Sequence, residues 1–268
     1  MTDSLSRLTS HWRAGFVLAL LISLGAAACA GKKEALPSDP AQADRFLLDK
    51  GKEALTKKKW IDAREYFRKV VDNYPNSSYR AEAKLGIGES YLAEKSSESL
   101  VLAAAEFRDF LMFYPTNELA DRAQFSLAMT YFKQMHPADR DQTPTKEALT
   151  EFGIFFERFP KSSLMPEART NWRVARDRLS EHSYRVGVSY YKRTWRLCPA
   201  AVSRFREILR EDPEYSGMDG VYFYMAECFA RADNKAEAIP LFDRVVNEYK
   251  TSEHLEKAQK RLKELQAQ

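Results

Sequence analysis

Apolar residues recur at helical spacing in five segments of the chain. In the first segment, Ala63, Phe67, Val70, Val71 and Tyr74 follow one another at intervals of 4, 3, 1 and 3 residues. These intervals place the side chains on one face of an α-helix. The other four segments repeat the small residue, the aromatic ring and the apolar pair; they span Ala103–Tyr114, Ala148–Phe159, Ala201–Leu209 and Ala238–Tyr249.

Proline closes four of the segments, and a second helical pattern follows each one. The four prolines are Pro75, Pro115, Pro160 and Pro213, and Lys250 takes the corresponding place in the fifth segment. Proline ends a helix because it lacks an N–H donor and restricts the preceding residue. Small polar residues come next, and we expect them to be the N-caps of the following helices. These candidates are Ser77-Ser78, Thr116-Asn117, Ser162-Ser163, Ser216 and Ser252.

Each repeat is therefore predicted to be helix A, helix B and a closing residue. Residues 42–250 resemble tetratricopeptide repeats in this arrangement. One helical hairpin cannot bury its apolar face alone, whereas stacked hairpins can. A last amphipathic segment carries Leu255, Ala258, Leu262 and Leu265 and is predicted to cap the array. The expected fold class is all-α: a superhelical solenoid of five tetratricopeptide-like hairpins plus a C-terminal capping helix.

Two irregularities interrupt the repeat. Residues 136–144 insert a polar, proline-containing loop into the third copy. The fourth copy has an unusually long first helix, expected from about Pro166 to Arg193. We expect this helix to join two halves of the array, residues 45–160 with repeats 1–3 and residues 161–268 with repeats 4–5 and the cap.

The N-terminal residues are predicted to be a signal peptide rather than part of the fold. Arg7 and Arg13 precede an apolar run, residues 14–28, which is short for a membrane-spanning helix but fits a secretory segment. Cys29 follows at the position of the lipid-modified cysteine of bacterial lipoproteins. Ala26 departs from the usual leucine of that site, so plain cleavage after Ala28 is the alternative. Residues 29–44 are expected to form the lipidated N-terminus and a tether.

Composition narrows the functional classes. The chain has 42 basic and 38 acidic residues and a formal net charge of +4, which gives no nucleic-acid signature. No metal-ligand spacing, nucleophile elbow or phosphate loop is found, so we expect no catalytic site, no metal and no cofactor. Cys198 and Cys228 are predicted either to pair or to remain buried thiols.

Five features together make the chain resemble the BamD-type outer-membrane β-barrel assembly lipoproteins. Two are the signal peptide followed by a cysteine and the five repeats. The others are the Tyr-Pro-Asn-Ser-x-Tyr ending of the first repeat, the stretch Asp139–Ala148, and Tyr190–Arg193 leading into Ala201–Arg204. Asp212, in place of an aromatic residue before Pro213, departs from the pattern. The resemblance implies a non-enzymatic scaffold, anchored by lipid in the periplasmic leaflet of the outer membrane. It implies that residues 45–160 bind unfolded outer-membrane proteins and that residues 161–268 dock a BamA-type insertase.

Two groups of residues are candidate contact sites. The client groove is expected at Arg80, Lys84, Tyr91, Gln124 and Tyr131, although Tyr91 and Tyr131 recur at one offset from proline, as core residues do. The insertase-docking site is expected at Tyr190, Tyr191, Arg193, Trp195, Arg196 and Arg204, because arginine beside aromatic residues is typical of interface hot spots. The alternative for Arg204 is a solvated helix face with an intramolecular ion pair.

Other envelope functions fit the repeat pattern less well. A Tol–Pal coordinator usually has an N-terminal coiled coil, and residues 30–44 are too short for one. A pilus-secretin pilotin usually has regular 34-residue repeats, whereas the prolines here are 40, 45 and 53 residues apart. An envelope hydrolase would need a catalytic constellation, which the sequence lacks.

Overall fold

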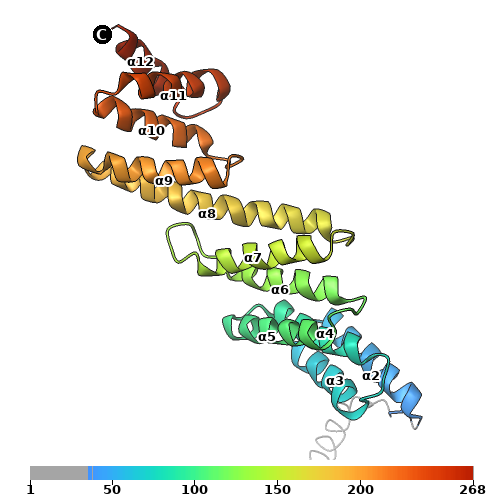
Figure 1. Cartoon of the computed structure of the whole chain (residues 1–268). Coiled ribbons are helices and arrows are strands. Elements are labelled where there is room, and N and C mark those ends of the chain that lie inside the picture. Colours follow the sequence, from blue (N-terminus) through green and yellow to red (C-terminus); the bar gives the residue numbers. More distant parts are fainter. Residues whose placement is uncertain (1–35, 38, 268) are drawn as a thin grey trace, which may run out of the picture. The chain divides into compact units, whose positions relative to one another are not determined.

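The described part of the protein is built from helical hairpins. The structure, a computed structural model, describes residues 36, 37 and 39–267. The chain divides into two units, Met1–Ala43 and Asp44–Gln268. The described residues contain eleven α-helices, one short 3₁₀ helix and no strand, which confirms the all-α prediction (Figure 1).

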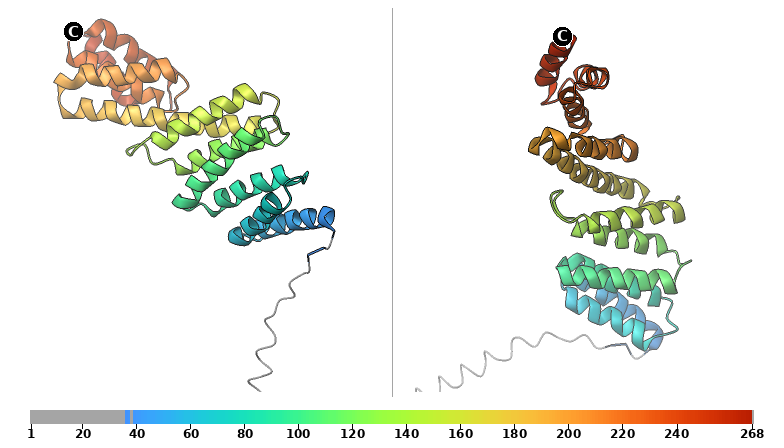
Figure 2. Two further views of the ribbon diagram at one scale, coloured as in Figure 1. Left: turned by 60° about the horizontal axis from the view of Figure 1, so that its bottom comes forward. Right: turned by 60° about the vertical axis from the view of Figure 1, so that its left-hand side comes forward.

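Five helical hairpins follow one another in chain order and a single helix comes last, as all views show (Figures 1 and 2). We number these hairpins 1 to 5. Their helices are α2 (Pro40–Thr56) with α3 (Trp60–Asn73), α4 (Arg80–Glu94) with α5 (Ser97–Phe113), α6 (Ala120–Gln134) with α7 (Thr143–Arg158), α8 (Met165–Arg193) with α9 (Cys198–Glu211), and α10 (Met218–Arg231) with α11 (Lys235–Glu248). The 3₁₀ helix η1 (Trp195–Leu197) precedes α9, and α12 (Leu255–Gln266) is the capping helix. The predicted helical repeat solenoid is confirmed.

The repeated apolar positions form the core. The first aromatic ring of each copy is at most 1% exposed, and the alanine four residues before it is 0% exposed in every copy. Glycine makes room for these rings in neighbouring helices. A Cβ atom on Gly51 or Gly86 would come within 2.4 or 2.7 Å of the Phe67 ring. The five buried rings are Phe67, Phe107, Phe152, Phe205 and Phe242.

The predicted N-caps were wrong in position. The helix that follows each of the four prolines and Lys250 starts later than predicted, and its N-cap residue makes no side-chain cap bond. These N-cap residues are Tyr79, Leu119, Leu164, Gly217 and His254. The polar side chain instead stabilises the turn before the helix. Ser77 Oγ accepts the N–H of Tyr79 at 3.1 Å, and three other turns repeat this bond. Ser216 departs from the pattern, because its N–H donates to Asp177.

The long helix α8 contacts residues of hairpins 3, 4 and 5. Near its start, Trp172 meets Phe156 of α7 edge-on, with ring centroids 6.3 Å apart. Towards its end, Tyr184 lies 6.2 Å from both Phe205 of α9 and Tyr224 of α10. The predicted extent of about Pro166 to Arg193 agrees with the observed helix to within one residue.

Asp212 is explained by its contacts with α8. Its side chain is 2% exposed and accepts hydrogen bonds from Arg173 Nη2 at 2.6 Å and from Ser180 Oγ at 2.5 Å. The carboxylate thus takes the place that an aromatic ring has in the other copies. It links the end of α9 to the middle of α8.

The N-terminal boundary of the helical array lies before the expected one. Helix α2 already begins at Pro40, so the last five residues of the expected tether are helical. Proline is favoured in the first turn of a helix because its missing N–H would be unpaired there in any case. Cys29 and the rest of the predicted signal peptide and lipidation site lie outside the described residues.

Candidate functional site

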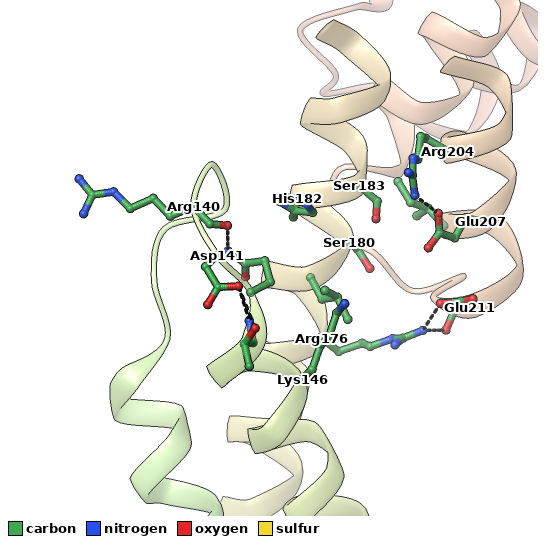
Figure 3. A pocket seen from close by; sticks show the side chains of 14 residues that line it. Arg140, Asp141, Lys146, Arg176, Ser180, His182, Ser183, Arg204, Glu207 and Glu211 are labelled. Carbon is green, nitrogen blue, oxygen red and sulfur yellow. Dashed lines mark hydrogen bonds and ion pairs between the residues drawn. The ribbon is translucent and has the colours of Figure 1, made fainter. Parts of the chain in front are cut away.

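Arg204 lines an open pocket of about 450 Å³ formed by three segments. Figure 3 shows Arg140 and Asp141 of the inserted loop on one side, Ser180, His182 and Ser183 of α8 in the middle, and Arg204, Glu207 and Glu211 of α9 on the other side. Arg204 Nη1 is 3.0 Å from Glu207 Oε2, and 46% of the Arg204 side chain is exposed. The intramolecular ion pair considered for Arg204 therefore exists, within reach of solvent.

The other basic side chains around this pocket differ in whether they bind acidic or carbonyl groups of the chain. Arg176 donates a hydrogen bond to the carbonyl oxygen of Glu211, and its Nη2 is 3.8 Å from Glu211 Oε2. Lys146 has no carboxylate within 4.0 Å among the described residues. Arg140 points away from the other labelled side chains (Figure 3). Lys146 and Arg204 are thus the cations best placed for a partner that enters the pocket.

The inserted loop is fixed by polar contacts. Gln142 is buried, and its Nε2 donates to the carbonyl oxygens of Pro137 at 2.8 Å and Arg140 at 3.0 Å. From α8, His182 Nδ1 lies 2.6 Å from the carbonyl oxygen of Ala138, and Arg178 donates to that of His136 at 2.8 Å. The motif at 139–148 therefore shapes one wall of the pocket.

A second pocket, of about 330 Å³, lies between the start of α9 and the end of α10. Trp195 and Arg196 line it, and the guanidinium carbon of Arg196 is 5.8 Å from the centre of the Trp195 ring. Trp195 is 62% exposed. The predicted docking residues thus fall into separate places, because Arg204 belongs to the first pocket and Trp195 and Arg196 to the second. Arg193 is exposed at the end of α8.

Tyr190 and Tyr191 pack against the core of the C-terminal hairpins. The Tyr191 hydroxyl donates to Glu227 Oε2 at 3.4 Å, and the guanidinium of Arg231 lies 3.6 Å from the ring centre. Burial raises the pKa of Tyr191 to about 12. These contacts assign Tyr191 to the packing of α8 on α10.

Arg80 and Lys84, two of the expected groove residues, bind neighbouring groups of the chain. Arg80 donates to the carbonyl oxygen of Val71 at 3.1 Å. Lys84 Nζ lies 2.6 Å from Glu106 Oε2 and 3.3 Å from Asp109 Oδ2. Burial opposes its charged form, but these carboxylates raise the pKa of Lys84 above its ordinary value. Lys84 therefore links α4 to α5.

Gln124 lies inside the protein and not on a surface. Its side chain is 2% exposed, and Nε2 donates to Glu151 Oε2 at 2.7 Å and to the Glu151 carbonyl oxygen at 3.1 Å. A partner cannot reach it in this conformation. The pairing of Gln124 with Glu151 across 27 residues of sequence stabilises the contact between α6 and α7.

Tyr91 and Tyr131 are half-buried and take part in equivalent pairs. The Tyr91 hydroxyl accepts a hydrogen bond from Arg68 at 2.9 Å, and the Tyr131 hydroxyl accepts one from Arg108 at 2.5 Å. Burial raises the pKa of Tyr131 above its ordinary value. Tyr91 also lines an open pocket of about 550 Å³ with residues of α3, among them the exposed Ile61. Tyrosine at this repeat position thus packs against the neighbouring helix and, in the case of Tyr91, also lines a surface pocket.

An arginine that recurs in three of the repeats was not identified in the sequence analysis. Arg68, Arg108 and Arg206 all stand seven residues before the proline of their repeat. Arg206 lies over the Phe229 ring at 5.9 Å and Arg108 over the Tyr131 ring at 5.5 Å, whereas Arg68 contacts the Tyr91 hydroxyl. The repeat alignment contains this signal, since each aromatic partner follows its arginine by 23 residues.

The described residues hold no group of three or more His, Cys, Asp or Glu side chains arranged to bind a metal ion. Cys198 and Cys228 are free, buried thiols. Among the same residues, no helix has the length and apolar character that crossing a membrane requires.

The fold and its pockets define a tetratricopeptide-type helical-repeat protein with charged surface sites. A model of the outer membrane lipoprotein family YfiO matches residues 40–238, and the chain belongs to this family. It is similar to the outer membrane protein assembly factor BamD of Caulobacter vibrioides, with 26% identity over 225 residues that cover 83% of this chain and 72% of the relative. The BamD of Vibrio cholerae is 24% identical over 208 residues, which cover 74% of this chain and 82% of that protein.

A solved structure with similar helical architecture is the complex of the yeast Sti1 TPR2AB domain with pHSP90. The likeness covers 82% of this chain and 84% of that chain, with a TM-score of 0.43 and 13% sequence identity. The resemblance to BamD-type lipoproteins predicted from the sequence is confirmed by the family match and the relatives.

Proposed function

We propose that this protein is a non-enzymatic scaffold for the assembly of β-barrel proteins in the outer membrane. Lipid on Cys29 holds it at the periplasmic leaflet. Hairpins 1–3 bind segments of unfolded outer-membrane proteins, and hairpins 4 and 5 dock the periplasmic domains of a BamA-type insertase. The observation that carries this proposal is the family match over residues 40–238, together with relatives named as outer membrane protein assembly factors.

The pocket around Arg204 supports docking through charge. The Arg204–Glu207 pair is exposed and lies within one helix turn, and such pairs contribute only about 0.2–1 kcal/mol. A carboxylate of the insertase can therefore replace Glu207 at small cost. Lys146 of α7 lines the same pocket and offers a second cation to the same partner.

The pocket that Tyr91 of α4 forms with α3 supports client binding where hairpins 1 and 2 meet. Ile61 is 72% exposed there, and the exposed Arg68 lines the same pocket, whereas Arg64 is buried and pairs with Glu94 at 2.7 Å. An extended client segment needs both apolar contact and hydrogen-bond donors, and this surface presents both. Tyr91 belongs to the client surface, whereas the buried Gln124 is left out of it.

Co-purification tests the docking proposal. The full chain, tagged after Gln268, is captured from detergent-solubilised membranes. We expect a barrel protein with periplasmic domains near one to one, and about tenfold lower recovery with Arg204→Gln. Arg210→Gln is the matched control, since Arg210 is an exposed arginine of α9 that also pairs with a glutamate. Recovery of a secretin or a Tol–Pal component without an insertase would reject the proposal in favour of another envelope adaptor.

Depletion tests the assembly function itself. Loss of the protein is expected to lower the amounts of many outer-membrane β-barrel proteins at once, measured by quantitative proteomics of outer-membrane fractions. Lipoproteins that lack a barrel domain serve as the internal control. Normal barrel-protein amounts after complete depletion would refute the assembly function.

A further inference from the structure

The second pocket has an unusual combination of charge and apolar surface. Its lining includes three arginines, Arg196, Arg206 and Arg231, and no carboxylate. Two neighbouring arginines of α9, Arg204 and Arg210, both pair with glutamates. The basic groups of this pocket thus have no intramolecular ion pair to break before they bind an acid, whereas Arg204 and Arg210 have one.

Each of the three guanidinium groups faces an aromatic ring instead of an acid. The distances to the ring centres are 5.8 Å for Arg196 over Trp195, 5.9 Å for Arg206 over Phe229, and 3.6 Å for Arg231 over Tyr191. No carboxylate lies within 4.0 Å of any of the three among the residues that the structure describes. A ring contact of this kind orients the planar guanidinium and leaves N–H donors at its edge for carboxylates.

Arg231 is fixed most firmly. Its Nη1 donates to the carbonyl oxygen of Tyr191 at 3.0 Å, which ties the end of α10 to α8. Arg196 and Arg206 are exposed and form no such backbone bond with any residue that the structure describes. The side chains of Arg196 and Arg206 can therefore change rotamer to contact a ligand, whereas Arg231 contributes a positive charge at a fixed position.

The interior of the pocket is apolar. Cys198, Val202 and Cys228 line it, and all three belong to the packed core of the C-terminal hairpins. The volume of about 330 Å³ is at the lower end of the roughly 300–1,000 Å³ typical of ligand sites. Such a space suits one large side chain better than a long acyl chain. The exposed Trp195 at its edge supplies further apolar contact.

We propose that this pocket binds an acidic segment of a partner protein, with one large apolar side chain of that segment against Cys198 and Val202 and flanking Asp or Glu carboxylates on Arg196 and Arg206. This inference rests on the proposed scaffold function. It gives the C-terminal half a second contact, separate from the Arg204 pocket. The complementary charge of the unpaired arginines selects an acidic partner over a neutral one.

A peptide pair tests the chemistry of the occupant. The lipidated full-length mature protein in detergent is titrated against an immobilised, C-terminally amidated probe, Gly-Ser-Asp-Glu-Phe-Asp-Glu-Ser-Gly. We expect at least tenfold weaker binding when the acids are replaced by Asn and Gln, and also when the Phe is replaced by Ala. Binding is further expected to weaken between 50 and 300 mM NaCl. Equal binding of the charged and neutral peptides would overturn the proposal.

Variants locate the binding on the protein. Trp195→Ala and Arg206→Gln are expected to weaken the probe at least fivefold, whereas Arg210→Gln leaves it unchanged. All three side chains are exposed, so circular dichroism should show unaltered helix content. Unchanged probe affinity in both Trp195→Ala and Arg206→Gln would overturn the site. Competition by vesicles of dioleoylphosphatidylglycerol through these same residues would overturn the peptide as occupant in favour of lipid.

The pocket proposal and the scaffold proposal can be refuted independently of each other. If no insertase co-purifies but the probe binds through Trp195 and Arg206, the scaffold proposal fails and the pocket assignment stands. If the insertase co-purifies and is lost with Arg204→Gln, but the probe does not bind, only the pocket assignment fails.

Discussion

Asp212 tests whether a buried, hydrogen-bonded carboxylate can stabilise a repeat at a position where the other copies have an aromatic ring. Four copies have an aromatic ring at this position, whereas here a buried carboxylate binds Arg173 and Ser180 of α8. We predict that Asp212→Asn destabilises the protein. Asp212→Tyr, which restores the aromatic residue of the other copies, should destabilise it at least as much. The aromatic residues are Tyr74, Tyr114, Phe159 and Tyr249.

The magnitude follows from the contacts. Removing one partner of a buried ion pair costs about 3–5 kcal/mol when the remaining charge has no other partner. Arg173 is 29% exposed and keeps Asp177 at 3.1 Å, so part of that cost is avoided. We therefore expect Asp212→Asn to lower the free energy of unfolding by about 2 kcal/mol. This value lies within the range of about 1.5–3 kcal/mol for a hydrogen bond to a charged group.

The stability that Asp212 provides should depend on pH. Burial acts to raise the pKa of this carboxyl, but the hydrogen bonds from Arg173 and Ser180 outweigh it and lower the pKa below the usual value. A group whose pKa is lower in the folded state stabilises the fold above its unfolded pKa, about 3.9 for Asp, and loses this contribution as pH falls through the folded value. The difference between wild type and Asp212→Asn should thus be largest near neutral pH and shrink below pH 4.

Urea unfolding of the mature chain, followed by far-ultraviolet circular dichroism and tryptophan fluorescence, measures the effect. Asp243→Asn is the control, because Asp243 is exposed on α11 and should change stability by less than about 0.5 kcal/mol. A double-mutant cycle with Arg173→Met should give a coupling energy of about 1–2 kcal/mol, in the usual range for residues in contact. If Asp212→Asn unfolds within about 0.5 kcal/mol of wild type at pH 7, the buried-pair reasoning is refuted.

Three further predictions concern substitutions of single residues. Gly187→Ala should lower the melting temperature, because its Cβ would lie 2.5 Å from the Phe205 ring, and overpacking of about 1–3 kcal/mol outweighs a helix-propensity gain of about 1 kcal/mol. An unchanged or higher melting temperature would contradict this. Burial lowers the pKa of His254, which stacks on Phe223 at 4.6 Å, so the urea midpoint should fall as pH drops below about 6.5, and His254→Phe should reduce that dependence. An equal pH slope in both proteins would contradict it. Cys29→Ser should move the protein from the membrane to the soluble fraction; retention at the membrane would argue for another anchor.

The core was predictable because its signal is local and periodic. The spacing that groups Ala63, Phe67 and Val70 depends only on helical geometry, and all three are buried. The helix starts were not predicted correctly, because they depend on the backbone of the turn. Ser77 stands where an N-cap is expected from its type, yet it bonds to Tyr79 within the turn and the helix begins afterwards.

The candidate sites were harder to predict because they depend on contacts between distant segments. Gln124 looked accessible, since nothing near it in the sequence identifies Glu151 as its partner. Arg196 and Arg204 are close in sequence, but one precedes α9 and the other lies two turns inside it, so they line different pockets. Arg231 belongs to the second pocket only through the packing of α10 on α8 and α9.

Helix α8 limits how this protein can change over evolution. In an array whose repeats touch only their neighbours, whole repeats can be duplicated or deleted at little cost. The 29 residues of α8 contact α7 near one end and α9 and α10 near the other. A deletion that removes hairpin 3 would therefore expose the first turns of α8, and one that removes hairpin 4 would leave hairpin 3 without its covering helix. Lineages of this protein should consequently gain or lose sequence in the loops, such as residues 135–142, while the number of hairpins stays constant.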